Sequence, residues 1–152
     1  MRPSGASRTA PVIRVLIIDD NRNGLLVRRA ILEQAGYSTS TAQCPVEGLR
    51  AFEQGDFDLV ITDYRMPILG GVEVIQRIRS VRPETPIILI SSVAEVLGLD
   101  ERTTGANAVI SKTANEAQQM LRTVARLLRT RSARKNVAKS HRAAAASAVK
   151  LG

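Results

Sequence analysis

The hydrophobic positions of this 152-residue chain alternate between two periods from Val12 onward. Short runs of branched aliphatic residues predict strands buried on both faces, and apolar residues three and four positions apart predict helices between them. The predicted strands cover residues 12–18, 37–41, 59–62, 87–90 and 108–111. The predicted helices cover residues 21–35, 45–55, 71–81, 93–104 and 115–131. This alternation indicates an α/β domain with a parallel sheet and right-handed crossovers.

Residues with strong positional preferences support several of these boundaries. Asn21 and Asn23 can cap the first helix, and Gly36 occupies the position where a helix commonly ends. Pro45 opens the second helix at the position that best tolerates proline. Gly98 interrupts the fourth helix, whereas the last helix carries an unbroken apolar face. The second strand is short and polar, so we expect it at an edge of the sheet.

Four of the predicted strands end in polar side chains. Asp19 and Asp20 follow the first strand, Asp63 the third, Ser91 the fourth and Lys112 the fifth. Parallel strands present their carboxyl ends along one edge of a sheet, where α/β proteins bind ligands, so we expect one site there. Carboxylates this close would repel one another, and a bound cation together with the lysine would relieve that repulsion. The set suits a divalent cation and a phosphoryl group.

Each of these residues also has an ordinary structural explanation when it is taken alone. Asp19 and Asp20 can form a turn and a helix cap. Ser91 can bond to its own backbone at the end of a strand, and Lys112 can be a surface lysine. Only the ordered set at matching strand ends favours a functional site.

The ordered set resembles a receiver domain, the phosphoacceptor module of bacterial two-component response regulators. The resemblance extends over roughly residues 11–131 and rests on Asp19-Asp20, Asp63 with Met66-Pro67 after it, Ser91, and Lys112 after Gly105-Ala106. It implies the flavodoxin-like receiver fold, an α/β fold in which a five-stranded parallel sheet of order 2-1-3-4-5 carries helices on both faces.

The resemblance also implies a role for each site residue. Asp63 would accept the phosphoryl group as an aspartyl-phosphate, Ser91 would donate its hydroxyl to a phosphoryl oxygen, and Lys112 would pair with that group or with Asp63. The implied cofactor is Mg²⁺, a cation that prefers oxygen ligands. Its implied ligands are Asp20, Asp63, the backbone carbonyl of Arg65 and, through water, Asp19. This is self-phosphorylation and dephosphorylation chemistry, and we do not expect a turnover enzyme.

Two positions depart from the pattern of the family. Thr113 follows Lys112 where the family usually has proline, often after a cis bond. A non-proline cis bond costs about 2.5–4 kcal/mol, so the conformation of this bond stays open at the level of sequence. Val109 stands where the family usually has an aromatic ring whose rotamer reports phosphorylation, so a rotating-ring switch cannot operate there.

The net charge of +8 comes from the two ends of the chain. Residues 11–130 hold 14 basic and 14 acidic residues, the first ten residues hold 2 arginines, and residues 131–152 hold 6 basic residues and no acid. We therefore divide the chain into an N-terminal segment at 1–10, a receiver domain at 11–131 and a basic, alanine-rich tail at 132–152. The tail is expected to be disordered or a frayed extension of the last helix, because isolated helices of this length are marginal in water.

Cysteine content and hydropathy limit the cellular locations and the partners that we expect for this protein. Cys44 is the only cysteine, which excludes an internal disulfide and fits a reducing cytoplasm. No run of 18 apolar residues predicts a membrane span, and the first ten residues lack the apolar stretch of a signal peptide. We expect a cytoplasmic protein with no membrane partner.

The expected function is that of a response regulator, which takes a phosphoryl group onto Asp63 from a histidine kinase or a histidine phosphotransfer protein. Its output would be a protein contact at the surface formed by residues 93–104, residues 108–111 and the last helix. On that helix Arg122, Arg126 and Arg129 form a cationic stripe, which is either a docking surface for an acidic partner or a solvated face. A receiver that never carries phosphate is disfavoured because all five site groups are present.

An alternative function is that of a nucleic-acid-associated regulator. The basic tail could attract phosphates without sequence preference. It lacks the aromatic residues on which bases stack. Nucleic acid is expected as a partner through the tail only.

Overall fold

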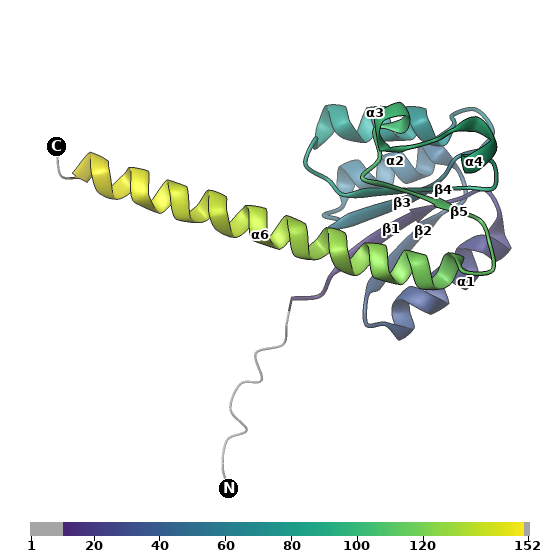
Figure 1. The fold of residues 1–152 in the computed structure, drawn as a ribbon, viewed down its shortest axis with the longest axis horizontal. Coiled ribbons are helices and arrows are strands. Elements are labelled where there is room, and N and C mark those ends of the chain that lie inside the picture. The colour runs from purple at the N-terminus through teal and green to yellow at the C-terminus, as the bar shows by residue number, and fades with distance from the viewer. Residues whose placement is uncertain (1–10, 151–152) are drawn as a thin grey trace, which may run out of the picture.

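The structure, a computed structural model, describes residues 11–150 of the chain, and the side chains of residues 11–148. Five parallel strands form one sheet in the order β2-β1-β3-β4-β5 (Figure 1). The strands are β1 (Arg14–Ile18), β2 (Ser38–Ala42), β3 (Leu59–Asp63), β4 (Ile87–Ser91) and β5 (Ala108–Ser111). This confirms the predicted fold class and strand order, with the polar second strand at an edge.

Helices cover both faces of the sheet (Figure 1). They are α1 (Arg22–Gln34), α2 (Pro45–Gln54), α3 (Gly71–Val81), α4 (Ala94–Leu97), α5 (Glu101–Thr104) and α6 (Glu116–Lys150). One apolar cluster joins α1 and α6 to one face of the sheet, and a second joins α2 and α3 to the other. Strands β3 and β4 are buried along their whole length, so the polar groups at their ends are held on a rigid frame.

The segment at residues 93–104 differs from its prediction. It forms two short helices, α4 and α5, in place of one. Gly98 adopts a left-handed conformation with φ of 61°, which ends α4. Asp100 then starts α5 anew, because its side chain accepts a hydrogen bond from the backbone N–H of Thr103.

The last helix continues through Lys150, so its predicted end near Arg131 is wrong. No glycine or proline occurs between Glu116 and Lys150, and alanine, arginine and lysine are strong helix formers. A helix that already has a packed first half extends without a new nucleation step. Beyond Arg131 every residue through 148 is exposed, and α6 projects away from the sheet (Figure 1).

The division into domains stays a prediction, and the segment at 1–10 lies outside the described residues. Within residues 11–150, no helix is long and apolar enough to cross a membrane.

Candidate functional site

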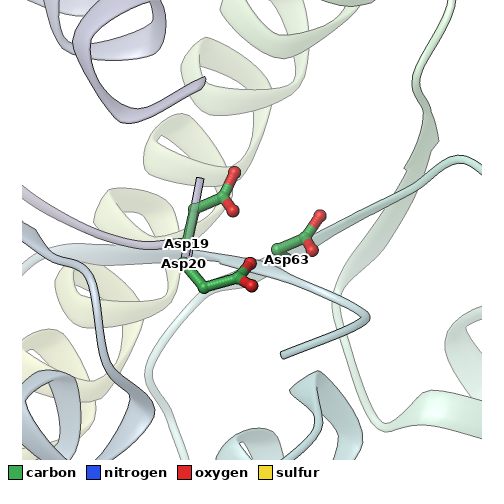
Figure 2. A group of neighbouring side chains, drawn as sticks. All are labelled: Asp19, Asp20 and Asp63. Carbon is green, nitrogen blue, oxygen red and sulfur yellow. The ribbon is translucent and has the colours of Figure 1, made fainter. Parts of the chain in front are cut away.

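Strand pairing brings the three predicted carboxylates together. Ile18 of β1 pairs with Thr62 of β3. The residues that follow them in the sequence, Asp19 and Asp63, therefore lie at the same edge of the sheet. Oxygen atoms of Asp19, Asp20 and Asp63 lie within 4.8 Å of one another, and Figure 2 shows the three carboxylates close together. Asp19 and Asp63 are buried, whereas Asp20 is exposed.

Lys112 and Ser91 meet the carboxylates through strands β4 and β5. The backbone N–H of Lys112 donates to the carbonyl of Ser91 over 3.0 Å, and Lys112 Nζ lies 2.5 Å from Asp63 Oδ1. That oxygen is buried and accepts no hydrogen bond of ordinary geometry within the described part of the chain, although it faces the ammonium. Ser91 Oγ accepts a hydrogen bond from the N–H of Val93 over 3.1 Å, so its own proton is available to donate.

The charge state of Asp63 depends on its surroundings. Burial is the largest cause and raises the pKa of this carboxyl. The Lys112 ammonium lowers that pKa, the neighbouring Asp19 raises it, and the balance leaves the pKa above its ordinary value. A divalent cation between these carboxylates would stabilise the ionised form.

A buried arginine also belongs to the site. Arg28 of α1 donates from Nη1 to Asp19 Oδ2 and from Nε to Glu116 Oε1, the latter over 2.7 Å. The second oxygen of Asp19 accepts a hydrogen bond from the N–H of Asn21 over 2.9 Å. A Cβ atom at Gly24 would lie 3.0 Å from Asp19 Oδ2, so glycine leaves room for this ion pair. We call Asp19, Arg28 and the half-buried Glu116 the buried triad, after its two buried members.

The sequence pattern contained a signal for this arginine that the site prediction did not use. Leu25 and Leu32 are buried on the inner face of α1, and Arg28 lies between them at the same helical spacing. Charged residues are seldom fully buried without a partner. An arginine at a core position of an amphipathic helix therefore indicates a buried acid nearby. Glu116 left no comparable signal, because it lies 88 residues away in the sequence.

The loop after β3 forms another wall of the site. Asp20, Tyr64, Arg65, Met66 and Pro67 line an open pocket there, together with the start of α3. A Cβ atom at Gly71 would lie 2.3 Å from the carbonyl oxygen of Asp63, so only glycine lets α3 begin this close to the strand. Across the site no peptide bond is cis, so the bond between Lys112 and Thr113 is trans.

Comparison with known proteins decides the family. The model of the response regulator receiver domain matches residues 15–125. The chain belongs to the response regulator receiver-domain family. The predicted resemblance is thereby confirmed, and the strand order agrees with that of solved receiver domains.

Individual relatives show how far the similarity extends. The uncharacterized transcriptional regulatory protein YkoG of Bacillus subtilis (strain 168) is 35% identical over 102 residues, which is 64% of this chain and 43% of that protein. The chain thus spans less than half of that relative. A CheY-like receiver domain from Methanospirillum hungatei JF-1 superposes with a TM-score of 0.75 at 27% identity, over 81% of this chain and 98% of that one.

A second solved structure is that of a complex. The response regulator TrrA from Thermotoga maritima, in complex with Mg²⁺ and BeF, superposes with a TM-score of 0.70 at 30% identity. The similarity covers 76% of this chain and 99% of that one. Receiver domains of two-component systems are phosphorylated on aspartate by histidine kinases or phosphotransfer proteins, and they bind Mg²⁺ in an acidic pocket. This receiver domain has a cluster of three aspartates, Asp19, Asp20 and Asp63, at one edge of its sheet.

Proposed function

We propose that this receiver domain accepts a phosphoryl group on Asp63 from a histidine kinase or a histidine phosphotransfer protein. We further propose that it signals through a protein contact that depends on this phosphorylation. One observation carries the proposal: the Asp63 carboxylate lies close both to the carboxylates of Asp19 and Asp20 and to the Lys112 ammonium. A carboxylate in such surroundings can act as a nucleophile toward phosphorus.

The transfer step needs only a positioned nucleophile and compensating charge. An oxygen of Asp63 attacks the phosphorus of a phosphohistidine, the P–N bond breaks, and its electron pair returns to the imidazole nitrogen. Negative charge on the phosphoryl oxygens is met by the Lys112 ammonium and by the proton of Ser91 Oγ. Water later attacks the phosphorus, the P–O bond to Asp63 breaks, and phosphate and the free carboxylate result.

The donor set fits Mg²⁺, which prefers oxygen ligands and retains several waters. Bound there, the ion would supply positive charge between the carboxylates and the phosphoryl oxygens. We assign Asp20, Asp63 and the Arg65 carbonyl as direct ligands, and Asp19 as a ligand through water. The contacts of Asp19 support this division, because Arg28 and the backbone of Asn21 already engage both of its oxygens.

The surface around α4, α5, β5 and α6 is the proposed site of output. Val96 and Leu97 of α4 are exposed apolar residues. A groove along the edge strand β5 is lined by the half-buried Val109, by Arg122 and Arg126 of α6, and by one acid, Glu101 of α5. Apolar side chains beside a cationic rim suit a protein partner with an acidic surface.

The acceptor assignment is tested by intact mass measurement after incubation with acetyl phosphate and Mg²⁺. We expect one added phosphoryl group on the native chain and none on Asp63→Asn. Asp56→Asn is the matched control, because Asp56 is exposed just before β3, at the opposite end of that strand from Asp63, and this variant should be labelled like the native chain. Full labelling of Asp63→Asn would refute the assignment.

The output surface is tested separately with Arg122, Arg126 and Arg129 replaced together by alanine. We expect labelling of Asp63 to be unchanged and binding of a labelled polyglutamate peptide to weaken, with less salt dependence than in the native chain. If labelling is retained and peptide binding does not change, these arginines are only a solvated face.

A further inference from the structure

The side chains on the inward face of α6 change from apolar to basic where the helix leaves the sheet. Met120, Val124 and Leu127 are buried against the sheet. At the same helical spacing the following turns carry five cations in place of apolar residues. They are Arg131, Arg134, Lys135, Lys139 and Arg142, which we call the basic face. The helix therefore presents a row of positive charge on the side that, one turn earlier, packs on the domain.

Few acids lie near the basic face. Arg131 pairs with Asp58, 3.4 Å from its Oδ1, and donates to its carbonyl over 2.6 Å. Glu84 lines the same groove as Arg134, Lys135 and Arg142. Between 11 and 148, the other four cations of the basic face take part in no ion pair. No acidic residue follows Glu116 anywhere in the chain, so α6 cannot neutralise these charges itself.

We propose that the basic face binds the phosphate backbone of double-stranded DNA, without sequence preference. Residues 131–142 span about 16 Å of helix, along which a duplex presents on the order of nine phosphate charges. Arginine side chains can also meet phosphate oxygens with two parallel hydrogen bonds. α6 projects away from the sheet (Figure 1), and residues 132–148 are all exposed, so this segment leaves room for a partner as large as a duplex.

The side chains of this segment argue against the other polyanions. A protein interface needs an apolar core, and the interfacial helix of a membrane protein needs an apolar side. Residues 132–148 consist mainly of alanine, serine and cations, with Val137 as their only larger apolar residue. Single-stranded nucleic acid is bound through aromatic stacking, and α6 has no aromatic ring other than the His141 imidazole. Binding by charge alone is characteristic of duplex phosphates.

Binding is tested by fluorescence anisotropy of a labelled, random-sequence DNA duplex titrated with the full chain at several salt concentrations. Each phosphate contact contributes about −0.9 to the slope of log Kobs against log salt, so the four free cations predict a slope of about −3.6. Lys135→Gln/Arg142→Gln should reduce the magnitude of that slope by about 1.8. Lys135→Arg/Arg142→Lys keeps the charge and should keep the native slope.

The matched control is Arg50→Gln/Arg77→Gln. It removes the same charge, but Arg50 and Arg77 are exposed on α2 and α3, the helices that pack on the face of the sheet opposite α6. We expect it to keep the native slope. Glutamine has a high helix propensity, so both pairs should keep the native circular dichroism. If Lys135→Gln/Arg142→Gln loses helicity, the single variants Lys135→Gln and Arg142→Gln are measured instead. Each should reduce the magnitude of the salt slope by about 0.9.

Three results would overturn the proposal. The first is an equal loss of slope in both glutamine pairs, which would indicate diffuse attraction to net charge. The second is no duplex binding at low salt. The third is a loss of affinity for polyglutamate or for anionic lipid vesicles in Lys135→Gln/Arg142→Gln as large as its loss of affinity for the duplex, which would assign the basic face to another partner. The inference is independent of the phosphoacceptor role, so unphosphorylated Asp63→Asn should bind DNA with the native slope.

Discussion

Two neighbouring carboxylates, Asp19 and Asp20, show how much the surroundings of a single residue decide. Asp19 is 1% exposed and has both oxygens engaged, whereas Asp20 is exposed and lines the open pocket. The two residues are equivalent in the sequence pattern. Their different contacts assign them different tasks at a metal site.

We expect Asp20→Ala to weaken Mg²⁺ binding more than Asp19→Ala does. Loss of a group that acts on a metal through an intermediary typically costs about 10–100-fold in affinity, and loss of a direct ligand should cost more. Isothermal titration with Mg²⁺ measures both, with Asp56→Ala as a control of native affinity. The reverse order would contradict the assignment of direct and water-mediated ligands.

Another residue with an unusual conformation lies in the loop after β3. Ile68 has a φ of 75°, the only positive φ outside glycine within residues 11–150, and it is 83% exposed. A left-handed conformation costs an L-residue roughly 1–2 kcal/mol, and a β-branched side chain fits it poorly. The exposed side chain offers little packing in return.

Ile68→Gly should therefore raise the free energy of unfolding by about 1 kcal/mol, because glycine adopts this conformation without a steric penalty. Ile68→Val keeps the β-branch and should leave stability within about 0.5 kcal/mol of native. Urea denaturation measures both variants. A loss of stability in the glycine variant would show that the side chain contributes packing or restricts the unfolded chain by more than the strain it causes.

At the scale of elements, the buried triad connects three parts of the fold. It joins the end of β1 through Asp19, the inner face of α1 through Arg28, and the first turn of α6 through Glu116. These are the strand that carries the acidic pair and the helix that leaves the domain. The first turn of α6 is thereby fixed next to the candidate metal site.

We expect Arg28→Met to lower the free energy of unfolding by about 3–5 kcal/mol, because it leaves Asp19 buried and uncompensated. The adjacent Arg29 pairs with Glu33 on the exposed side of α1, so Arg29→Met should cost at most about 1 kcal/mol. Urea denaturation of both variants gives the comparison. Addition of Mg²⁺ should recover part of the loss in Arg28→Met, since the cation compensates Asp19. Equal costs in the two variants would show that the triad contributes no more than a surface pair.

At the scale of the whole molecule, α6 consists of two halves with different environments. Up to Arg131 it packs on the sheet, and from Ser132 through 148 every residue is exposed. Tertiary packing stabilises the first half, whereas the second half depends on helix propensity and on continuity with the first. The two halves of one continuous helix should therefore open with different free energies.

Hydrogen exchange measured by mass spectrometry should show this boundary. Amides at residues 120–131 should be protected to near the stability of the whole domain, and those at 132–148 should exchange orders of magnitude faster. Amides of the buried strand β4 provide the reference for global opening. Equal protection along α6 would indicate that the projecting half is covered, for instance by a second copy of the chain.

Much of the fold follows from local sequence, because local patterns specify its elements. Runs of buried aliphatic residues specify the strands, and Pro45 and Gly36 mark where helices begin and end. The candidate site could be predicted because parallel strands expose their carboxyl ends at one edge. The strand order itself came from the resemblance to a family, since nothing in the hydrophobic pattern states which strand lies next to which.

The tertiary structure alone decided what depends on residues far apart in the sequence. Arg28 and Glu116 are in contact although they lie 88 positions apart in the sequence. The local sequence around either residue does not indicate which residue it pairs with. The extension of α6 beyond Arg131 depends on the packing of its first half against the sheet. Periodicity reports which face of an element is buried. Whether a charged side chain is buried depends on the residues that pack around it in the fold. Whether an exposed helix continues depends on the packed segment from which it extends.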